Sequence, residues 1–78
     1  MIEIRVSFSG PSLFEGVNSG DVVKVEDGTT VRDFFLRHGV EERFLDYVVP
    51  YVGDDPKDLD YVLRNGDELR PFVPVSGG

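Results

Sequence analysis

Residues 29–39 read TTVRDFFLRHG, and their pattern predicts the one full α-helix of this chain. Thr30 can cap the start of that helix, with Asp33 three positions on in the manner of a capping box. The apolar face then recurs at i, i+3, i+4 and i+7: Val31, Phe34, Phe35 and His38. Gly39 comes next and suits the position just beyond a helix end. The segment therefore predicts a short helix over residues 31–38 with one buried face.

Two strands are expected before this helix. Apolar Ile2, Ile4, Val6 and Phe8 alternate with polar residues, which is the period of a half-buried strand. Residues 10–20 contain three glycines and a proline and are expected to form a loop. Residues 21–26 carry three valines and predict the second strand.

Further strands are expected after the helix. Residues 40–46 suit a short turn carrying Phe44 and Leu45, and residues 47–52 are strand-like, with Pro50 indicating an edge or a bulge. Residues 54–56 suit a turn, residues 59–63 a short apolar piece, and residues 65–67, Asn-Gly-Asp, a tight turn. Residues 68–73 predict the last strand, which Pro74 ends.

The order strand, strand, helix, strand, strand predicts an α+β domain of the β-grasp, or ubiquitin-like, type. One main helix would lie across one face of a mixed sheet, with the last strand parallel to the first. A ferredoxin-like plan would need a second full helix, which no segment supplies. The expected core comprises Ile2, Ile4, Val6, Val23 or its neighbours, Val31, Phe35, Leu63 and Leu69.

Composition narrows the function. The 78 residues allow one domain, expected over residues 1–75, with residues 76–78 as a tail. The absence of cysteine excludes disulfides, thiolate nucleophiles and zinc–thiolate sites. The net charge of −7 disfavours nucleic-acid binding. No apolar run approaches the length of a membrane span and no signal peptide is visible, so we expect no membrane contact and a cytoplasmic location.

The sequence finishes with Val75-Ser76-Gly77-Gly78. Glycine lacks Cβ and tolerates close approach by other groups. A Gly-Gly end therefore suits a thin finger that carries a carboxylate into a narrow slot of another protein. A frayed terminus without a role is the alternative.

The residues in front of this end carry a specific resemblance. Asn65-Gly66-Asp67-Glu68-Leu69 followed by Phe72-Val73-Pro74-Val75-Ser76-Gly77-Gly78 resembles the end of the MoaD/ThiS family of ubiquitin-like sulfur carrier proteins, and is closer to the MoaD branch. The strand ending at Phe8 and the Gly28-Thr29-Thr30-Val31 entry to the helix also fit. The resemblance covers the whole chain and is most specific in its last dozen residues.

The resemblance implies a protein cosubstrate and not an enzyme. An adenylyltransferase of the MoeB/ThiF type would use ATP to adenylate the Gly78 carboxylate, which a persulfide would convert to a thiocarboxylate. The thin Gly77 would let the tail reach the active sites, and Phe72, Val73, Pro74, Val75 and Ser76 would contact the partner. The chain itself would bind no cofactor and no metal. The sulfur acceptor is expected to be the large subunit of molybdopterin synthase.

Other residues are weaker candidates for a site. His38 is expected to be structural, since no Ser or Cys nucleophile is placed to pair with it. The aspartates at 54, 55, 58 and 60 lack the spacing of a calcium loop and suit a solvated loop. Leu13, Phe14 and Phe72 are compatible with either core or an exposed docking patch, and Val75 favours docking.

Several functions stay open on the sequence. The acceptor could be a pterin, a thiazole or a tRNA base, and ubiquitin-like protein modification uses related chemistry. The alternative of another class is a β-grasp interaction module with no covalent chemistry. The Gly-Gly end favours the carrier.

Overall fold

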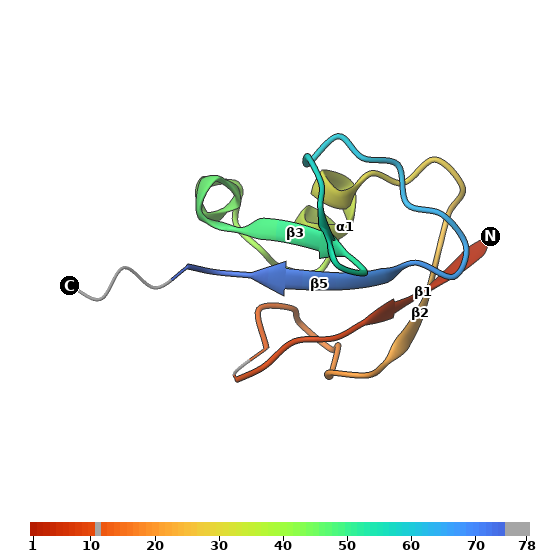
Figure 1. Cartoon of the computed structure of the whole chain (residues 1–78), viewed down its shortest axis with the longest axis horizontal. Helices are drawn as coiled ribbons and strands as arrows, with labels where there is room; N and C mark the ends of the chain where they lie inside the picture. Colours follow the sequence, from red (N-terminus) through yellow and green to blue (C-terminus); the bar gives the residue numbers. More distant parts are fainter. Residues whose placement is uncertain (11, 75–78) are drawn as a thin grey trace.

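The computed structural model describes residues 1–10 and 12–74, which form five strands, one α-helix and one 3₁₀ helix. The elements in chain order are β1 (Ile2–Val6), β2 (Val22–Val25), α1 (Val31–Arg37), η1 (Glu42–Tyr47), β3 (Val49–Val52), β4 (Asp55–Pro56) and β5 (Glu68–Phe72) (Figure 1). The predicted order of strands around one main helix is confirmed.

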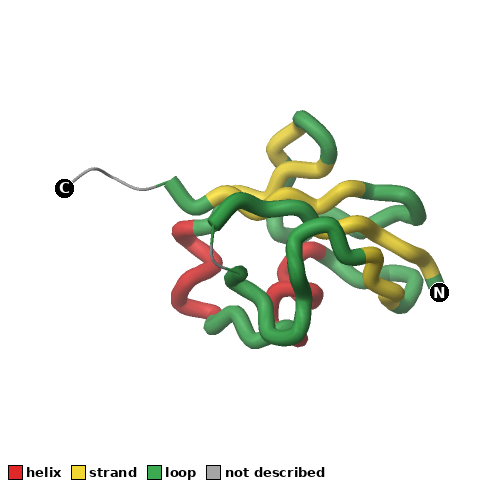
Figure 2. The backbone as a smooth tube through the Cα atoms, turned by 90° about the horizontal axis from the view of Figure 1, so that it is seen from below, coloured by secondary structure: helices red, strands yellow, loops and turns green. Residues whose placement is uncertain are grey.

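The strands make one mixed sheet in the order β2-β1-β5-β3-β4. β1 runs antiparallel to β2 and parallel to β5, whereas β5 pairs antiparallel with β3. β5 is thus the middle strand, although it is the last along the described chain. Both helical segments lie on one side of the sheet (Figure 2).

Local sequence fixes both ends of α1. The Thr30 side chain accepts a hydrogen bond from the backbone N–H of Asp33 at 3.1 Å, as the predicted cap requires. At the other end Gly39 adopts φ +88°, and the N–H of Val40 donates to the Phe35 carbonyl at 3.0 Å. This 6→1 bond belongs to a Schellman motif, which terminates the helix. A Cβ at Gly39 would lie 2.6 Å from the Glu15 side chain, so a larger residue does not fit.

The core lies between α1 and the sheet. Ile4, Val6, Val31, Phe35, Leu63 and Leu69 are buried as predicted, whereas Ile2 and Val23 are only partly buried at its margin. Val25 takes the buried place on β2. The core also takes in residues that the predicted set omitted: Phe14, Val17, Phe34, Val40, Leu45 and Val48.

Phe14 comes from the long loop between β1 and β2. Its ring lies 5.4 Å from that of Phe34 and 5.3 Å from that of Phe35, measured between centroids. The N–H of Glu15 donates to the His38 carbonyl at 2.8 Å, which ties the loop to the end of α1. Of the two roles open to Phe14, core is therefore the observed one.

Several predicted boundaries are wrong in detail. β1 ends at Val6 and β5 ends at Phe72, each earlier than the alternation suggested. Residues 55–56, predicted as a turn, form β4, because the chain reverses at Gly53, which has φ +62°.

Pro50 is neither on an edge nor at a bulge. It lies within β3, directly opposite Pro71 of β5 in a regular register. The Pro50 carbonyl accepts from the N–H of Lys57 at 2.8 Å, so it points away from β5. Because N and O of a strand residue point to the same side, the missing N–H of Pro50 costs no bond to β5.

The predicted turn over residues 65–67 is confirmed, and a carboxylate organises it. Asp67 Oδ2 accepts from the backbone N–H of Arg64 at 2.8 Å and from the Tyr61 hydroxyl at 3.0 Å. Partial burial, and next the hydrogen bond to Asp67, raise the pKa of Tyr61 above its ordinary value. Within the described residues, no helix is long and apolar enough to cross a membrane.

Phe35→Ala is expected to destabilise the domain strongly. Its side chain is fully buried, and truncating a buried Phe costs about 3–5 kcal/mol. Phe44→Ala is the control, since Phe44 is 47% exposed on η1 and should cost less than about 1 kcal/mol. Urea unfolding of the two variants measures the difference, and equal stabilities would contradict this packing.

Tyr61→Phe is expected to cost about 0.5–1.5 kcal/mol at neutral pH, through loss of one hydrogen bond. A raised pKa means that the folded state holds the phenolic proton more tightly than the unfolded chain. The contribution is therefore complete below the unfolded pKa of about 10 and is lost as pH rises through the folded pKa. Stability of wild type and variant should converge in alkali, and a pH-independent difference would refute the role of the hydroxyl.

Candidate functional site

The candidate site lies at the end of β5. Side chains alternate along this strand: Leu69 is fully buried toward α1, while Arg70 and Phe72 lie on the opposite, uncovered face. Phe72 is 53% exposed and Val73 is 38% exposed. Apolar side chains are therefore exposed to solvent at the end of β5.

Pro71 explains why the sheet opens here. The parallel ladder between β1 and β5 includes donation from Arg5 N–H to the Asp67 carbonyl and from Ser7 N–H to the Leu69 carbonyl. In a parallel ladder the next bond would run from the N–H of residue 71 to the Ser7 carbonyl. Proline has no N–H, so this bond cannot form. The recorded pairing accordingly stops at Val6 opposite Leu69.

A groove of about 730 Å³ lies beyond the end of this pairing. It extends between residues 70–73, which comprise the end of β5 and the residue after it, and the segment after β1. Its remaining lining comes from Ser7, Phe8, Ser9, Ser12, Leu13, Tyr51, Gly53 and Asp54. We call this feature the β5 groove.

Apolar and aromatic groups dominate the β5 groove. The Tyr51 and Phe72 rings meet edge to face, with their centroids 6.4 Å apart. Phe8 connects the groove to the core, because its ring centroid lies 6.3 Å from that of the buried Phe14. The charged pair at one end is weak, because Arg70 Nη1 and Asp54 Oδ1 are 3.4 Å apart and the Asp54 side chain is fully exposed. The Ser7 hydroxyl donates to Glu68 at 2.9 Å.

The structure brings together part of the predicted partner-binding set. Phe72 and Val73 line the groove, and Pro74 is exposed beside it. Val75, Ser76, Gly77 and Gly78 lie outside the described residues, so their predicted roles stay predictions. Leu13 is exposed in the groove, which favours docking over core for this residue.

Tyr51 and Arg70 were not among the predicted site residues. The signal for Tyr51 was available in part, because strand alternation around buried Pro50 places it on the uncovered face. The signal for the groove was Pro71 in a strand expected to run parallel to the first.

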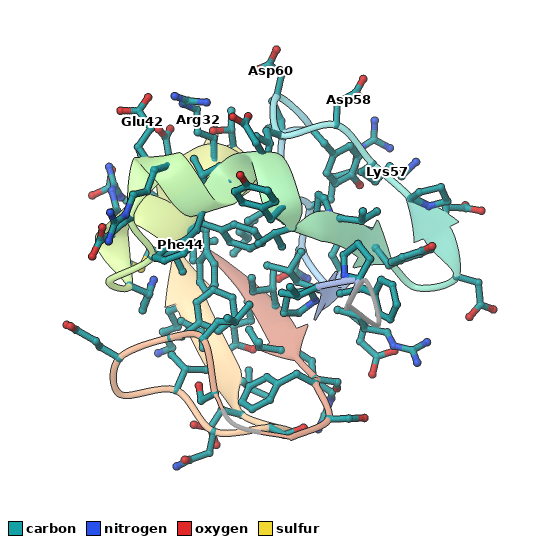
Figure 3. All side chains as sticks on the ribbon, turned by 90° about the vertical axis from the view of Figure 1, so that its left-hand side faces the viewer. Arg32, Glu42, Phe44, Lys57, Asp58 and Asp60 are labelled. Atoms are coloured by element: carbon teal, nitrogen blue, oxygen red, sulfur yellow. The ribbon has the colours of Figure 1, made fainter. Side chains whose placement is uncertain are left out.

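A second apolar area lies near the end of β5. Phe44 and Tyr47 are exposed on η1, and the chain enters β3 two residues later, at Val49, which pairs with Phe72. Figure 3 views the molecule from the end where β5 finishes and shows Phe44 there, on η1. The guanidinium of Arg43 covers the Phe44 ring at 5.1 Å.

The weaker candidates take structural or solvated positions. His38 Nδ1 lies 2.9 Å from the Phe34 carbonyl and its ring stacks on Phe34 at 4.2 Å, so it closes the end of α1. Asp58 and Asp60 project away from the domain (Figure 3). Among residues 1–10 and 12–74, no group of three or more Asp, Glu or His is placed to hold a metal ion.

A mixed sheet grasping one helix, with the last strand in the middle, defines a β-grasp, or ubiquitin-like, protein. Among solved structures, the chain is similar to SAMP1 from Haloferax volcanii, with a TM-score of 0.66 and 24% sequence identity. The alignment covers 97% of this chain and 99% of that one. No family model matches the sequence, and no curated protein matches it either. At this identity the likeness establishes the fold alone.

Phe72→Ala is expected to cost less than about 1 kcal/mol of stability, because the ring is half in solvent. Leu69→Ala, three residues earlier on the same strand, is expected to cost about 2–5 kcal/mol, because Leu69 is fully buried. Thermal or urea unfolding of both variants measures the contrast. A large loss for Phe72→Ala would show that its ring belongs to the core and not to a docking surface.

Proposed function

We propose that this protein is a sulfur carrier whose Gly78 carboxylate is the reacting group. The observation that carries the proposal is the run Phe72-Val73-Pro74-Val75-Ser76-Gly77-Gly78, which starts on the central strand of a β-grasp sheet. Exposed apolar residues beside a groove provide a surface that a partner can bind. The Gly-Gly end provides a narrow segment that can enter the partner's active site.

The chemistry needs an activated acyl group, because a free carboxylate has a poor leaving group. A carboxylate oxygen of Gly78 attacks the α-phosphorus of ATP in a partner enzyme, and pyrophosphate leaves. The terminal sulfur of a persulfide then attacks the acyl carbon, and AMP departs with the electron pair of the broken C–O bond. A thiol reduces the resulting acyl disulfide, which leaves the thiocarboxylate on the carrier and a disulfide on the donor side.

In this scheme the carrier supplies only the carboxylate and partner enzymes supply the other groups, which fits the residues of the chain. It has no cysteine to carry a persulfide and no Gly-x-x-x-x-Gly-Lys-Ser/Thr loop to hold ATP. The persulfide and the nucleotide pocket would belong to the partners. The first partner is an adenylyltransferase of the MoeB/ThiF type.

The sulfur acceptor we propose is the large subunit of molybdopterin synthase. The tail is nearer to the MoaD branch than to the thiazole branch, and this likeness supports the choice. Both partners must take the same tail, so they should bind in turn and compete. The cytoplasm is the compartment in which this chemistry is expected.

Deletion of Gly77 and Gly78 is expected to abolish adenylation without changing the melting temperature by more than a few degrees. Gly77→Val should lower adenylation severely as well, because a β-branched side chain obstructs a slot shaped for glycine. The measurements are ATP–pyrophosphate exchange with the activating enzyme of the native cell and a thermal melt. Full adenylation of the truncated protein would refute the carrier.

Co-purification from the native cell tests the acceptor. Recovery of the molybdopterin synthase large subunit, with a carrier whose mass shows exchange of one oxygen for sulfur, is the expected result. Recovery with a thiazole synthase, or as conjugates joined to lysine side chains, would replace this acceptor by one of the alternatives.

A further inference from the structure

The walls of the β5 groove present main-chain groups as well as apolar side chains. Residues 67 and 69 direct their carbonyls to β1, whereas the Glu68 carbonyl accepts from Gly53 N–H at 2.9 Å on the β3 side. By this alternation the Pro71 carbonyl points into the groove. The N–H of Val73 points into the groove as well when the strand geometry continues past Phe72. On the opposite wall, the Ser7 carbonyl faces β5 on the same alternation, because Ser7 N–H donates to Leu69.

These groups have no recorded partner inside the part of the chain that the structure describes. No hydrogen bond there joins the Ser7 or Pro71 carbonyl, or the Val73 N–H, to another described residue. By contrast, the adjacent Phe8 is held on its other side, where the Ser19 hydroxyl bonds its N–H and its carbonyl at 3.0 and 2.9 Å. On the β1 side of the groove, Ser7 is therefore bonded to β5 and Phe8 is bonded to the loop before β2.

We infer that the β5 groove binds an extended segment of the activating enzyme as an added β-strand along residues 71–73. This inference rests on the proposed function, and it names the mode of recognition. The Pro71 carbonyl would accept from the incoming strand, the Val73 N–H would donate to it, and apolar side chains of the strand would contact Leu13 and Phe72. Strand addition supplies affinity through the main chain and specificity through such side-chain contacts.

The short length of chain between Val73 and Gly78 indicates which protein binds in the β5 groove. Gly78 lies five positions after Val73, and an extended chain spans at most about 3.3–3.6 Å per residue, or roughly 17 Å in all. An enzyme that holds the Gly78 carboxylate in its active site must therefore cover the surface around Val73. The net charge of −7 and the fully exposed Asp54 at the groove end favour a segment flanked by basic residues.

Pro71 also fixes the register of the added strand. Pro71 has a backbone carbonyl that can accept a hydrogen bond, but it has no N–H to donate one. If the bound segment were shifted by one residue, a carbonyl of that segment would lie against the proline ring and find no donor. The same residue that stops the β1–β5 ladder thus keeps the edge open and selects the alignment of what binds there.

Val73→Pro compared with Val73→Ala tests the main-chain contact. Proline removes the N–H at an exposed position, whereas alanine keeps the N–H and removes the side chain. With the adenylyltransferase of the native cell, Val73→Pro should raise the KM for the carrier about tenfold with kcat retained, and Val73→Ala much less. Equal KM values for the two variants would overturn the added strand.

Hydrogen–deuterium exchange measures the contact directly. The Val73 amide of the wild-type protein should exchange at least about tenfold more slowly when the adenylyltransferase is bound without ATP, since it becomes hydrogen-bonded. Unchanged exchange at Val73 in a complex that still adenylates Gly78 would overturn the inference and leave the proposed function intact. Absence of adenylation in the wild-type protein would instead refute the proposed function.

Pro71→Val is the complementary variant. It restores an N–H directed at the Ser7 carbonyl, so the β1–β5 ladder should lengthen and the groove should narrow. The new amide should exchange slowly in the free protein, and the KM for adenylation should rise about tenfold. A slowly exchanging amide with a wild-type KM would show that the groove is not used, and a rapidly exchanging amide would show that Ser7 does not face this edge.

Discussion

Short parallel pairing between β1 and β5 is the constraint on which this structure depends. The recorded register comprises Arg5 opposite Glu68 and Val6 opposite Leu69, and it joins the β1–β2 hairpin to the rest of the sheet. Val6 and Leu69 are both fully buried beneath α1, so the helix covers this junction. Backbone pairing and helix packing thus stabilise the same residues. Where the pairing stops at Pro71, the sheet opens and the groove begins.

The fold could be predicted largely because local signals agreed with one another. The helix at residues 31–38 had a cap, a periodic apolar face and a glycine stop, and the structure contains all of these over Val31–Arg37 with His38 as the closing residue. The parallel placement of the last strand followed from the order of elements. The core was harder to predict, because Phe14 and Val17 lie in a loop where no periodicity marks a buried position.

The site could be predicted only in part, for a related reason. The exposed apolar residues Phe72 and Val73 were found from their place before the tail, and Leu13 was recognised as ambiguous. Tyr51 was not found, because its role depends on lying across the sheet from Phe72, a relation that needs the register of β3 against β5. The two prolines show the same limit. Each reads in sequence as a break, yet Pro50 opposes Pro71 in a position where neither needs an N–H toward the other strand.

The position of β5 has a consequence for how the chain matures. β5 comes last among the described elements but fills the centre of the sheet, between β1 and β3 (Figure 1). Strand pairs separated by more than sixty residues, as Arg5 and Glu68 are, close late in folding because loop closure must come first. The β5 groove therefore does not exist until the sheet is complete. An enzyme that binds this groove would therefore act only on folded copies of its substrate. It would not act on newly made or damaged copies in which β5 is not paired with β1 and β3.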